Sequence, residues 1–311
     1  MPIVSARGFD ISYSCNDAER TSSSGTLVLI HGAGGQEIDW PLAWRSSNDI
    51  TRELGLTPKG HSNMLDKFQI YAVDLPGHGK SGGTGMDSVF DYSNVIEAVI
   101  EALGLENVCV VGHSMGACIA LALINGKNPR ITSACMIGGA SKMDVSDTIL
   151  EGLNKEFENT VEYIVKYSWY NETGAFFKQK AIQRMKAAGK ETVFNDFLAC
   201  SKFDMSNELS KIDLPVLVIA SDHDRMVKLE VSKSMSAEMP NSIFLPIENC
   251  GHFQHIEQTE LVANEIANFL ENHSKKKWQS EGIINQAVMN LSNAPSRADT
   301  ITTHLIGSSF S

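Results

Sequence analysis

The sequence predicts an α/β fold with a doubly wound, mostly parallel β-sheet and helices on both of its faces. Continuous apolar runs of strand length recur along the chain, and each stops at small or polar residues. Strands without polar alternation are typical of a parallel sheet that is buried on both faces. Amphipathic helical patterns separate the runs, and the chemically interesting residues follow the run ends.

The predicted elements follow one another in a regular order. Residues 3–14 hold two short β-type runs around Gly8, which predicts an antiparallel hairpin. The apolar runs that follow lie within residues 26–35, 68–79, 107–116, 131–140, 215–224 and 242–252. Helical patterns cover residues 87–103, 117–125, 228–239 and 259–272. This strand–helix alternation indicates one doubly wound domain.

Two segments interrupt the alternation. Residues 141–210 contain no strand-like run and are typical of helices rich in Phe, Tyr and Trp. They are expected to form a helical cap, or lid, inserted between two strands of a core made of residues 1–140 and 211–273. Residues 274–311 are polar and lack a period, which predicts a loosely ordered tail. The long stretch at 41–67 receives no assignment.

Bulk composition excludes some functions. The 311 residues carry a net charge of −11, whereas a nucleic-acid-binding protein needs a concentrated basic face. The longest apolar run, residues 117–124, is far shorter than the roughly 18 residues of a membrane span. Arg7 and Asp10 lie where a secretion signal would be apolar, so the six cysteines are expected to be reduced thiols in a soluble, cytoplasmic protein.

Glycine-rich loops raise the question of nucleotide binding. The loop at 31–37 has Glu37 where a dinucleotide fingerprint needs glycine. The loop at 75–81 follows Asp74, which stands in the place of the first glycine of a phosphate-binding loop. Both patterns fail at a required position, so no nucleotide cofactor is predicted.

The pattern G-x-S-x-G occurs twice, around Ser81 and around Ser114. A nucleophilic serine in this pattern needs a strand before it, a sharp turn at it and a helix after it. Only Ser114 has this context, because an apolar run precedes it and a helical pattern follows it. Ser114 is therefore the candidate nucleophile, although a serine at a helix start can also be a simple cap.

An oxyanion formed at Ser114 would need hydrogen-bond donors. The Met115 N–H lies at the start of the predicted helix and is the first candidate donor. The second is expected from the loop at 31–34, whose small residues let the backbone approach a ligand. Ala33 N–H is the preferred candidate, and Gly34 N–H is the alternative.

A serine hydroxyl is a poor nucleophile without a general base. Of the nine histidines, His252 is best placed, because it follows the last apolar run on a glycine-containing loop. His255 is the weaker alternative. The glycine loops of His31, His78 and His113 suggest that backbone shape matters more there than titration.

Residues 221–227, "SDHDRMV", offer an acid to orient the base. They follow the apolar run before the one that leads to His252, so they reach the same edge of the sheet. A metal site would want further His, Asp or Cys clusters at ligand spacing, and none is evident in the sequence. No metal is therefore predicted, and Asp222 and Asp224 both remain candidate acids.

Taken together, the segments "LIHGAGG", "VDLPGHGKS", "VVGHSMGA", "SDHDRMV" and "ENCGHF" resemble the motifs of the α/β-hydrolase superfamily, in sequence and in order. The resemblance covers residues 3–272. It implies a catalytic triad of Ser114, Asp224 and His252, with Asp224 selected by the family pattern G-x-x-D-x-x-V. Ser221 stands in place of that glycine, which leaves Asp222 as a minor alternative. The resemblance also implies that residues 141–210 are the cap.

These observations predict a serine hydrolase of acyl compounds, a carboxylesterase first of all, that needs no cofactor. The small ester substrate is expected to be apolar, acyl or aryl, because Gly34, Trp40, Trp169 and Phe176 are candidates for its pocket. Most cap aromatics can equally be the cap's own core. A carbon–carbon bond hydrolase, a cofactor-free perhydrolase and a non-catalytic ligand receptor are the alternatives. The sequence does not indicate an oligomeric state.

Overall fold

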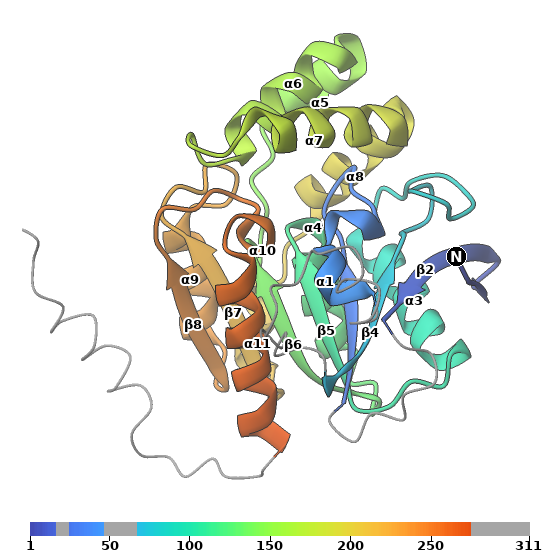
Figure 1. Cartoon of the computed structure of the whole chain (residues 1–311), viewed down its shortest axis with the longest axis vertical. Helices are drawn as coiled ribbons and strands as arrows, with labels where there is room; N and C mark the ends of the chain where they lie inside the picture. The colour runs from blue at the N-terminus through green and yellow to red at the C-terminus, as the bar shows by residue number, and fades with distance from the viewer. Residues whose placement is uncertain (17–24, 47–66, 275–311) are drawn as a thin grey trace, which may run out of the picture. The chain divides into compact units, whose positions relative to one another are not determined.

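A computed structural model of the chain describes residues 1–16, 25–46 and 67–274. It contains an eight-stranded sheet in the order β1-β2-β4-β3-β5-β6-β7-β8 (Figure 1). The predicted hairpin is confirmed as β1 (Ile3–Ala6) and β2 (Phe9–Cys15), which pair antiparallel. β2 also pairs antiparallel with β4, and the remaining neighbours are parallel. The predicted α/β class is therefore confirmed.

The parallel strands match the predicted apolar runs. They are β3 (Thr26–Ile30), β4 (Gln69–Val73), β5 (Val108–His113), β6 (Ile131–Ile137), β7 (Val216–Ser221) and β8 (Ser242–Ile247). β8 differs from the expectation of full burial, since most of its residues are only half-buried. The reason is its place at the edge of the sheet, where it has β7 alone as a partner among the described strands.

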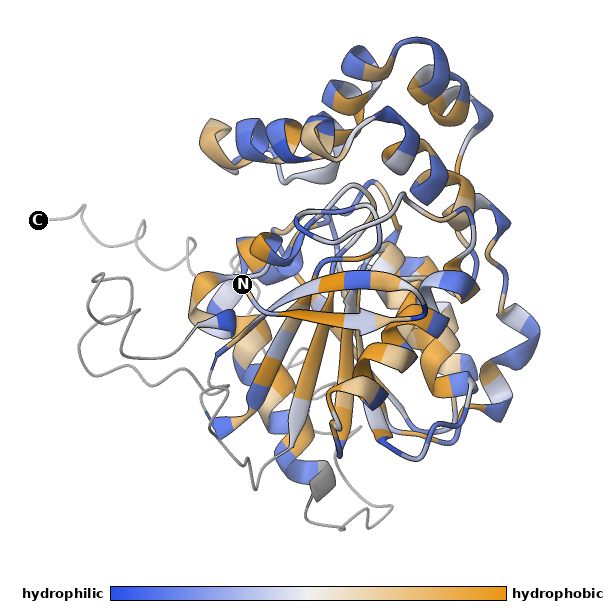
Figure 2. Ribbon diagram, turned by 90° about the vertical axis from the view of Figure 1, so that its right-hand side faces the viewer, coloured by the Kyte–Doolittle hydropathy of each residue, from blue (hydrophilic) through white to orange (hydrophobic). Residues whose placement is uncertain are grey.

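Helices cover both faces of the sheet. Within β5, Val108 and Val110 belong to one apolar cluster, and Cys109 and Val111 belong to another. The first cluster is completed by α3 (Val89–Ala102), α4 (Met115–Asn125) and α9 (Leu229–Glu238). The second is completed by α1 (Leu42–Arg45) and α11 (Thr259–Ser274). This alternation of side chains within one strand is the mark of a sheet covered on both faces. Figure 2 shows the strands of the sheet coloured mostly as hydrophobic.

The segment between β6 and β7 is helical, as predicted. It contains α5 (Asp147–Lys155), α6 (Phe157–Ser168), α7 (Ala175–Ala188), α8 (Lys190–Lys202) and the 3₁₀ helix η3 (Ser206–Lys211) (Figure 1). We call α5–α8 the insertion. Leu153, Val161 and Val193 are fully buried in an apolar cluster of the insertion itself. The insertion therefore has its own small core, and residues outside the insertion, such as Phe253, pack against it.

Other short elements complete the described chain. The 3₁₀ helix η1 (Glu37–Asp39) follows the glycine loop after β3, and α10 (Gln254–Glu257) follows His252. The stretch at 41–67 is described at 41–46 and at Lys67, and the rest of it lies outside the described residues. The predicted tail at 274–311 likewise lies outside them, apart from Ser274 at the end of α11.

Candidate active site

Ser114 occupies a sharp turn between β5 and α4. Its φ of 55° and ψ of −117° lie where non-glycine residues are strained. Hydrogen bonds maintain this conformation, since Ser114 N–H donates to the Ile137 carbonyl at 2.9 Å and Ala117 N–H donates to the Ser114 carbonyl at 2.9 Å. A strained backbone at the start of a helix is the geometry expected of an exposed nucleophile.

The glycines of the G-x-S-x-G pattern have a steric purpose. A Cβ at Gly112 would overlap the Gly116 carbonyl oxygen, and a Cβ at Gly116 would overlap the Ile30 carbonyl oxygen. A Cβ at Gly32 would lie 3.1 Å from the Ser114 Cβ. The loop after β3 and the turn after β5 can therefore approach each other only where side chains are absent.

His252 and Asp224 form a buried pair. His252 Nδ1 lies 2.7 Å from Asp224 Oδ2, and the two residues are 4% and 6% exposed. The other oxygen, Asp224 Oδ1, accepts hydrogen bonds from the N–H groups of Met226 and Val227 at 2.8 and 2.9 Å. A carboxylate is an acceptor only, so Nδ1 carries the proton and Nε2 is left to accept one. This is the tautomer that a general base needs.

Ser221, which departs from the family glycine, joins the two loops of this pair. Its hydroxyl donates to the Gly251 carbonyl at 2.6 Å and accepts from the Gln254 side-chain amide at 3.0 Å. The same amide lies 3.3 Å from Asp224 Oδ2. Sequence reasoning missed Gln254, because only the folded chain brings α10 against the loop after β7.

Asp222 and His223 lie at the surface and away from His252. His223 Nδ1 contacts Asp222 Oδ1 at 2.7 Å, with side chains 43% and 37% exposed. Partial burial by itself raises the pKa of Asp222, but the His223 hydrogen bond and charge and the backbone hydrogen bonds from Asn249 and Cys250 together outweigh it and lower that pKa. In the described ranges no group of three or more His, Cys, Asp or Glu side chains is arranged to hold a metal ion. The His252 imidazole is thus paired with the Asp224 carboxylate, and the Asp222 carboxylate is paired with His223.

The loop at 31–35 has a rigid peptide at its centre. The Gly32 carbonyl accepts from His31 Nδ1 at 2.8 Å and from the Gly35 N–H at 3.0 Å. In a trans peptide the carbonyl and the next N–H point in opposite directions, so these bonds also set the direction of the Ala33 N–H. Among the described residues, neither Ala33 N–H nor Met115 N–H donates to a protein acceptor.

The Gly34 N–H, the alternative oxyanion donor, has a hydrogen-bond partner within the protein. This group donates to Asp196 Oδ2 at 2.7 Å and is thus already engaged. Asp196 lies in α8 of the insertion, far from Gly34 in the sequence. Sequence reasoning had no signal for this contact, because it depends on how the insertion docks.

Two further histidines surround His252 and stay neutral. Burial, aided by the neighbouring histidines, lowers the pKa of His113 well below its ordinary value. Burial and the charge of His252 lower the pKa of His255 to about 3. His113 Nε2 lies 2.8 Å from the His252 carbonyl, so it supports the His252 loop. His255 is fully buried beside Trp40, with ring centroids 4.5 Å apart, and is a poor candidate for a base.

A cavity of about 700 Å³ is lined by most of the predicted site residues, but not by Asp224 or Met115. Ser114, His252 and the loop at 31–35 line it, as do residues of the insertion. Of the predicted pocket residues, all line the cavity: Gly34, Trp40, Trp169 and Phe176. Ser81 does not, and its hydroxyl instead donates to the Asp74 carbonyl at 2.7 Å.

The fold and the geometry of the site are those of a hydrolase class, and comparisons with known sequences show the family. Residues 27–265 match the model of the Alpha/beta hydrolase family, so the chain belongs to this family. Over 228 residues the chain is 28% identical to the "Uncharacterized hydrolase YugF" of Bacillus subtilis, covering 67% of this chain and 82% of the relative.

Other relatives have more specific names. The chain is 27% identical over 263 residues to a "2-hydroxy-6-oxononadienedioate/2-hydroxy-6-oxononatrienedioate hydrolase" of Paraburkholderia phymatum, covering 79% and 86% of the two chains. It is 25% identical over 256 residues to the "Bifunctional esterase/perhydrolase DCH" of Acinetobacter calcoaceticus, covering 74% and 88%.

Solved structures share the fold. An enol-lactonase from Burkholderia xenovorans matches with a TM-score of 0.75 at 17% identity, over 87% of this chain and all (100%) of that one. A thermophilic esterase matches with a TM-score of 0.71 at 22% identity, over 87% and 97%. In the described part of this chain, no helix combines the length and the apolarity needed to cross a membrane.

Proposed function

We propose that the protein is a serine hydrolase that cleaves carboxylic esters through a triad of Ser114, His252 and Asp224. The observation that carries the proposal is the meeting, in one cavity, of a strained serine and a histidine whose Nδ1 is paired with a buried carboxylate. A strained Ser114 is exposed to substrate, and the paired His252 has its Nε2 available to take a proton.

The reaction proceeds in two halves. Ser114 Oγ attacks the ester carbonyl carbon while His252 Nε2 takes the hydroxyl proton, and Asp224 stabilises the resulting imidazolium. Collapse of the tetrahedral intermediate expels the alcohol, which receives that proton, and leaves an acyl group on Ser114. Water, activated by the same histidine, then attacks the acyl-enzyme and releases the carboxylic acid.

Negative charge on the intermediate needs donors that are already in place. The Met115 N–H is at the first turn of α4, where the helix dipole favours an anion. The Ala33 N–H is oriented by the bonds on the Gly32 carbonyl. We assign these two groups as the oxyanion hole.

The insertion acts as the cap over this site and shapes an apolar acyl or aryl pocket. Its aromatic side chains that line the cavity are Tyr163, Tyr167, Trp169, Phe176 and Phe177. Phe157 packs in the insertion's own core instead, and Tyr170 packs edge-on against His223 at 4.8 Å. The names of the esterase relatives agree with an ester substrate.

A fluorophosphonate probe tests the proposal directly. We expect peptide mapping to find the label on Ser114, and Ser114→Ala to lower kcat on a short aryl ester by about 10⁴- to 10⁶-fold. Ser81→Ala is the matched control, because its G-x-S-x-G context is outside the cavity. Unchanged turnover by folded Ser114→Ala, or label on Ser81, would refute the assignment. Absence of wild-type turnover on a broad ester panel would refute the ester proposal and leave a carbon–carbon bond hydrolase or a ligand receptor.

A second candidate is hydrolysis of a carbon–carbon bond, which the same triad can perform. Basic side chains line the cavity at Arg45, Lys180, Arg184 and Arg225. Arg45 and Arg184 are paired with Glu37 and Asp39, so Lys180 and Arg225 are the two that suit the carboxylates of a dioate. One relative is named for hydrolysis of such a compound. Initial rates on an aryl ester and on 2-hydroxy-6-oxononadienedioate, measured with one preparation, decide between the two reactions.

A further inference from the structure

Asp196 is a buried carboxylate that the proposed reaction does not use. It lies in α8 of the insertion and is 0% exposed. Burying an ionised carboxylate is costly unless several donors satisfy it.

Donors from separate parts of the core converge on this carboxylate. Oδ2 accepts from the Gly34 N–H at 2.7 Å and lies 2.8 Å from His78 Nε2. Oδ1 accepts from the Tyr92 hydroxyl at 2.5 Å. Gly34 belongs to the loop after β3, His78 to the loop after β4, and Tyr92 to α3. One side chain of the insertion thus joins these core segments.

The hydrogen-bond partners of His78 indicate its protonation state. Its Nδ1 lies 3.0 Å from the Pro76 carbonyl, and its Nε2 faces the Asp196 carboxylate. Both partners are acceptors, so both ring nitrogens carry protons. Burial by itself lowers the pKa of His78, but the charge and hydrogen bond of Asp196, the hydrogen bond to the Pro76 carbonyl and the charge of Asp74 together outweigh burial and raise it. The Gly34 N–H therefore shares Asp196 Oδ2 with the His78 imidazole.

The contact with Gly34 reaches the proposed oxyanion hole. Gly34 follows Ala33 directly, and its φ of 63° is in the left-handed region that favours glycine. The insertion also packs closely against Gly34, since a Cβ at Gly34 would lie 2.8 Å from Met185 Cγ. Asp196 thus holds the residue next to the donor while α7 restricts the space that the loop has to move.

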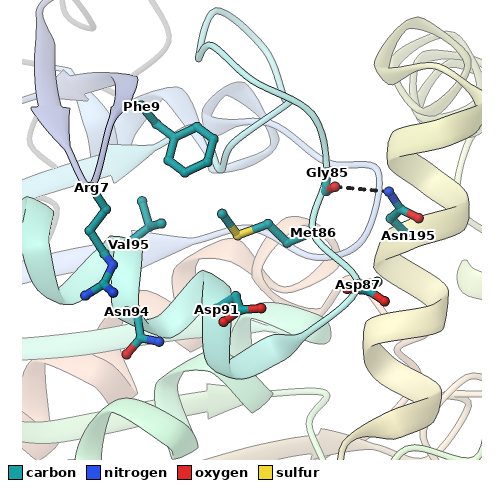
Figure 3. A pocket seen from close by; sticks show the side chains of 9 residues that line it. All are labelled: Arg7, Phe9, Gly85, Met86, Asp87, Asp91, Asn94, Val95 and Asn195. Carbon is teal, nitrogen blue, oxygen red and sulfur yellow. Dashed lines mark hydrogen bonds between the residues drawn. The ribbon is translucent and has the colours of Figure 1, made fainter.

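The same helix is tied to the core outside the cavity as well. The Asn195 side-chain amide donates to the Gly85 carbonyl at 3.0 Å, as Figure 3 shows. The Met86 N–H donates to the Tyr92 hydroxyl at 2.8 Å, which orients that hydroxyl toward Asp196. These contacts hold α8 against the core at Asn195 and Asp196, so Asp196 is presented to Gly34 by a docked helix.

We infer that Asp196 is a positioning residue: through the Gly34 N–H it holds the loop at 31–35 in the conformation that directs the Ala33 N–H at the oxyanion. The inference rests on the proposed function. It makes the insertion part of the catalytic geometry, in addition to its role in shaping the pocket. Small displacements of an oxyanion donor cost rate more than substrate affinity, because the bond matters most in the transition state.

The test is Asp196→Leu, which removes the acceptor at similar volume. We expect kcat on an aryl ester to fall by about 10- to 100-fold while KM changes by less than about threefold. The affinity of a matched trifluoromethyl ketone, whose tetrahedral adduct carries the oxyanion, should fall by the same factor as kcat/KM. Glu191→Leu is the matched control, because it removes an exposed carboxylate from the same helix, and its kcat and KM should stay within about twofold of the wild type.

Asp196→Leu leaves His78 without its partner, so the single variant can fail to fold. The double variant His78→Gln/Asp196→Leu removes the buried charge, and its kcat should lie at least about 10-fold below that of His78→Gln alone. In the wild type, the Gly34 amide should exchange with solvent slowly in a hydrogen-exchange measurement. Wild-type kcat in the double variant, a change confined to KM, or fast Gly34 exchange would each overturn the inference.

The inference and the proposed function fail differently. If the function is wrong, the wild type does not label at Ser114 and Ser114→Ala has wild-type activity. If only the inference is wrong, Ser114 still labels and Asp196→Leu turns over at the wild-type rate.

Discussion

At the scale of single residues, Asp224 and Asp222 differ in surroundings although they are two positions apart. Asp224 is 6% exposed, with one oxygen held by backbone N–H groups and the other on His252. Asp222 is half exposed to solvent and contacts His223. A carboxylate orients an imidazole only when it is itself held in place and shielded from water.

These surroundings predict different effects of removing each charge. Asp224→Asn is expected to lower kcat by about 10⁴-fold, because the amide stabilises the wrong imidazole tautomer. Asp222→Asn, the matched control, should lower kcat by at most about tenfold. Steady-state kinetics on one ester measure both, and prolonged EDTA treatment should leave activity unchanged. A mild Asp224→Asn beside a severe Asp222→Asn would contradict the proposed triad.

At the scale of elements, the insertion contributes in two ways. Its cavity-lining aromatics shape the pocket, and some of them are still open to solvent, such as Phe176 at 64% exposed. Its helix α8 reaches the loop at 31–35 through Asp196. Substitution of the lining residues is therefore expected to alter substrate preference more than chemistry, whereas substitution of Asp196 is expected to alter the chemistry.

Phe176→Ala tests the first of these contributions. We expect KM for an aryl ester to rise by about 3- to 10-fold with a smaller change in kcat, because the variant removes apolar contact with the substrate and leaves the triad intact. Phe90→Ala is the control, since Phe90 is comparably exposed, at 47%, but lies on α3 outside the cavity. Equal KM values for the two variants would separate Phe176 from the substrate pocket.

At the scale of the whole molecule, buried neutral histidines link stability to pH. Burial lowers the pKa values of His31, His113 and His255 in the folded chain, that of His255 to about 3. An unfolded histidine has a pKa of about 6.5, so below this pH the unfolded state binds more protons than the folded state. The stabilisation is complete above about pH 6.5 and is lost as pH falls toward the folded pKa values.

His255→Gln should therefore flatten the acid limb of the stability profile. Between about pH 5.5 and 4, one such histidine adds a slope of about 1.4 kcal/mol per pH unit to the unfolding free energy. We expect the variant to lose this share of the slope, whatever its stability at neutral pH. Urea unfolding at several pH values measures the slope, and an unchanged slope would show that His255 is protonated when folded.

The sequence by itself determined the fold class, the order of strands and helices, and the turn at Ser114. Each depends on local information: continuous apolar runs mark buried strands, and the glycines at 112 and 116 mark a turn where a Cβ would overlap a backbone oxygen. The family pattern likewise singled out Asp224 and His252. The fold brings His252 Nδ1 to 2.7 Å from Asp224 Oδ2.

Only the tertiary structure decided which polar groups meet across the sheet edge. Three hydrogen bonds join segments that no sequence spacing relates: Gln254 with Asp224, His113 with the His252 carbonyl, and Asp196 with the Gly34 N–H. The Gly34 N–H, a candidate oxyanion donor in the sequence, donates to Asp196 because the insertion docks there. Hydrogen bonds of this kind depend on the docking of helices to within a few tenths of an ångström, and docking is decided by the packing of whole surfaces. Local sequence patterns specify which surfaces are apolar, but not how they fit.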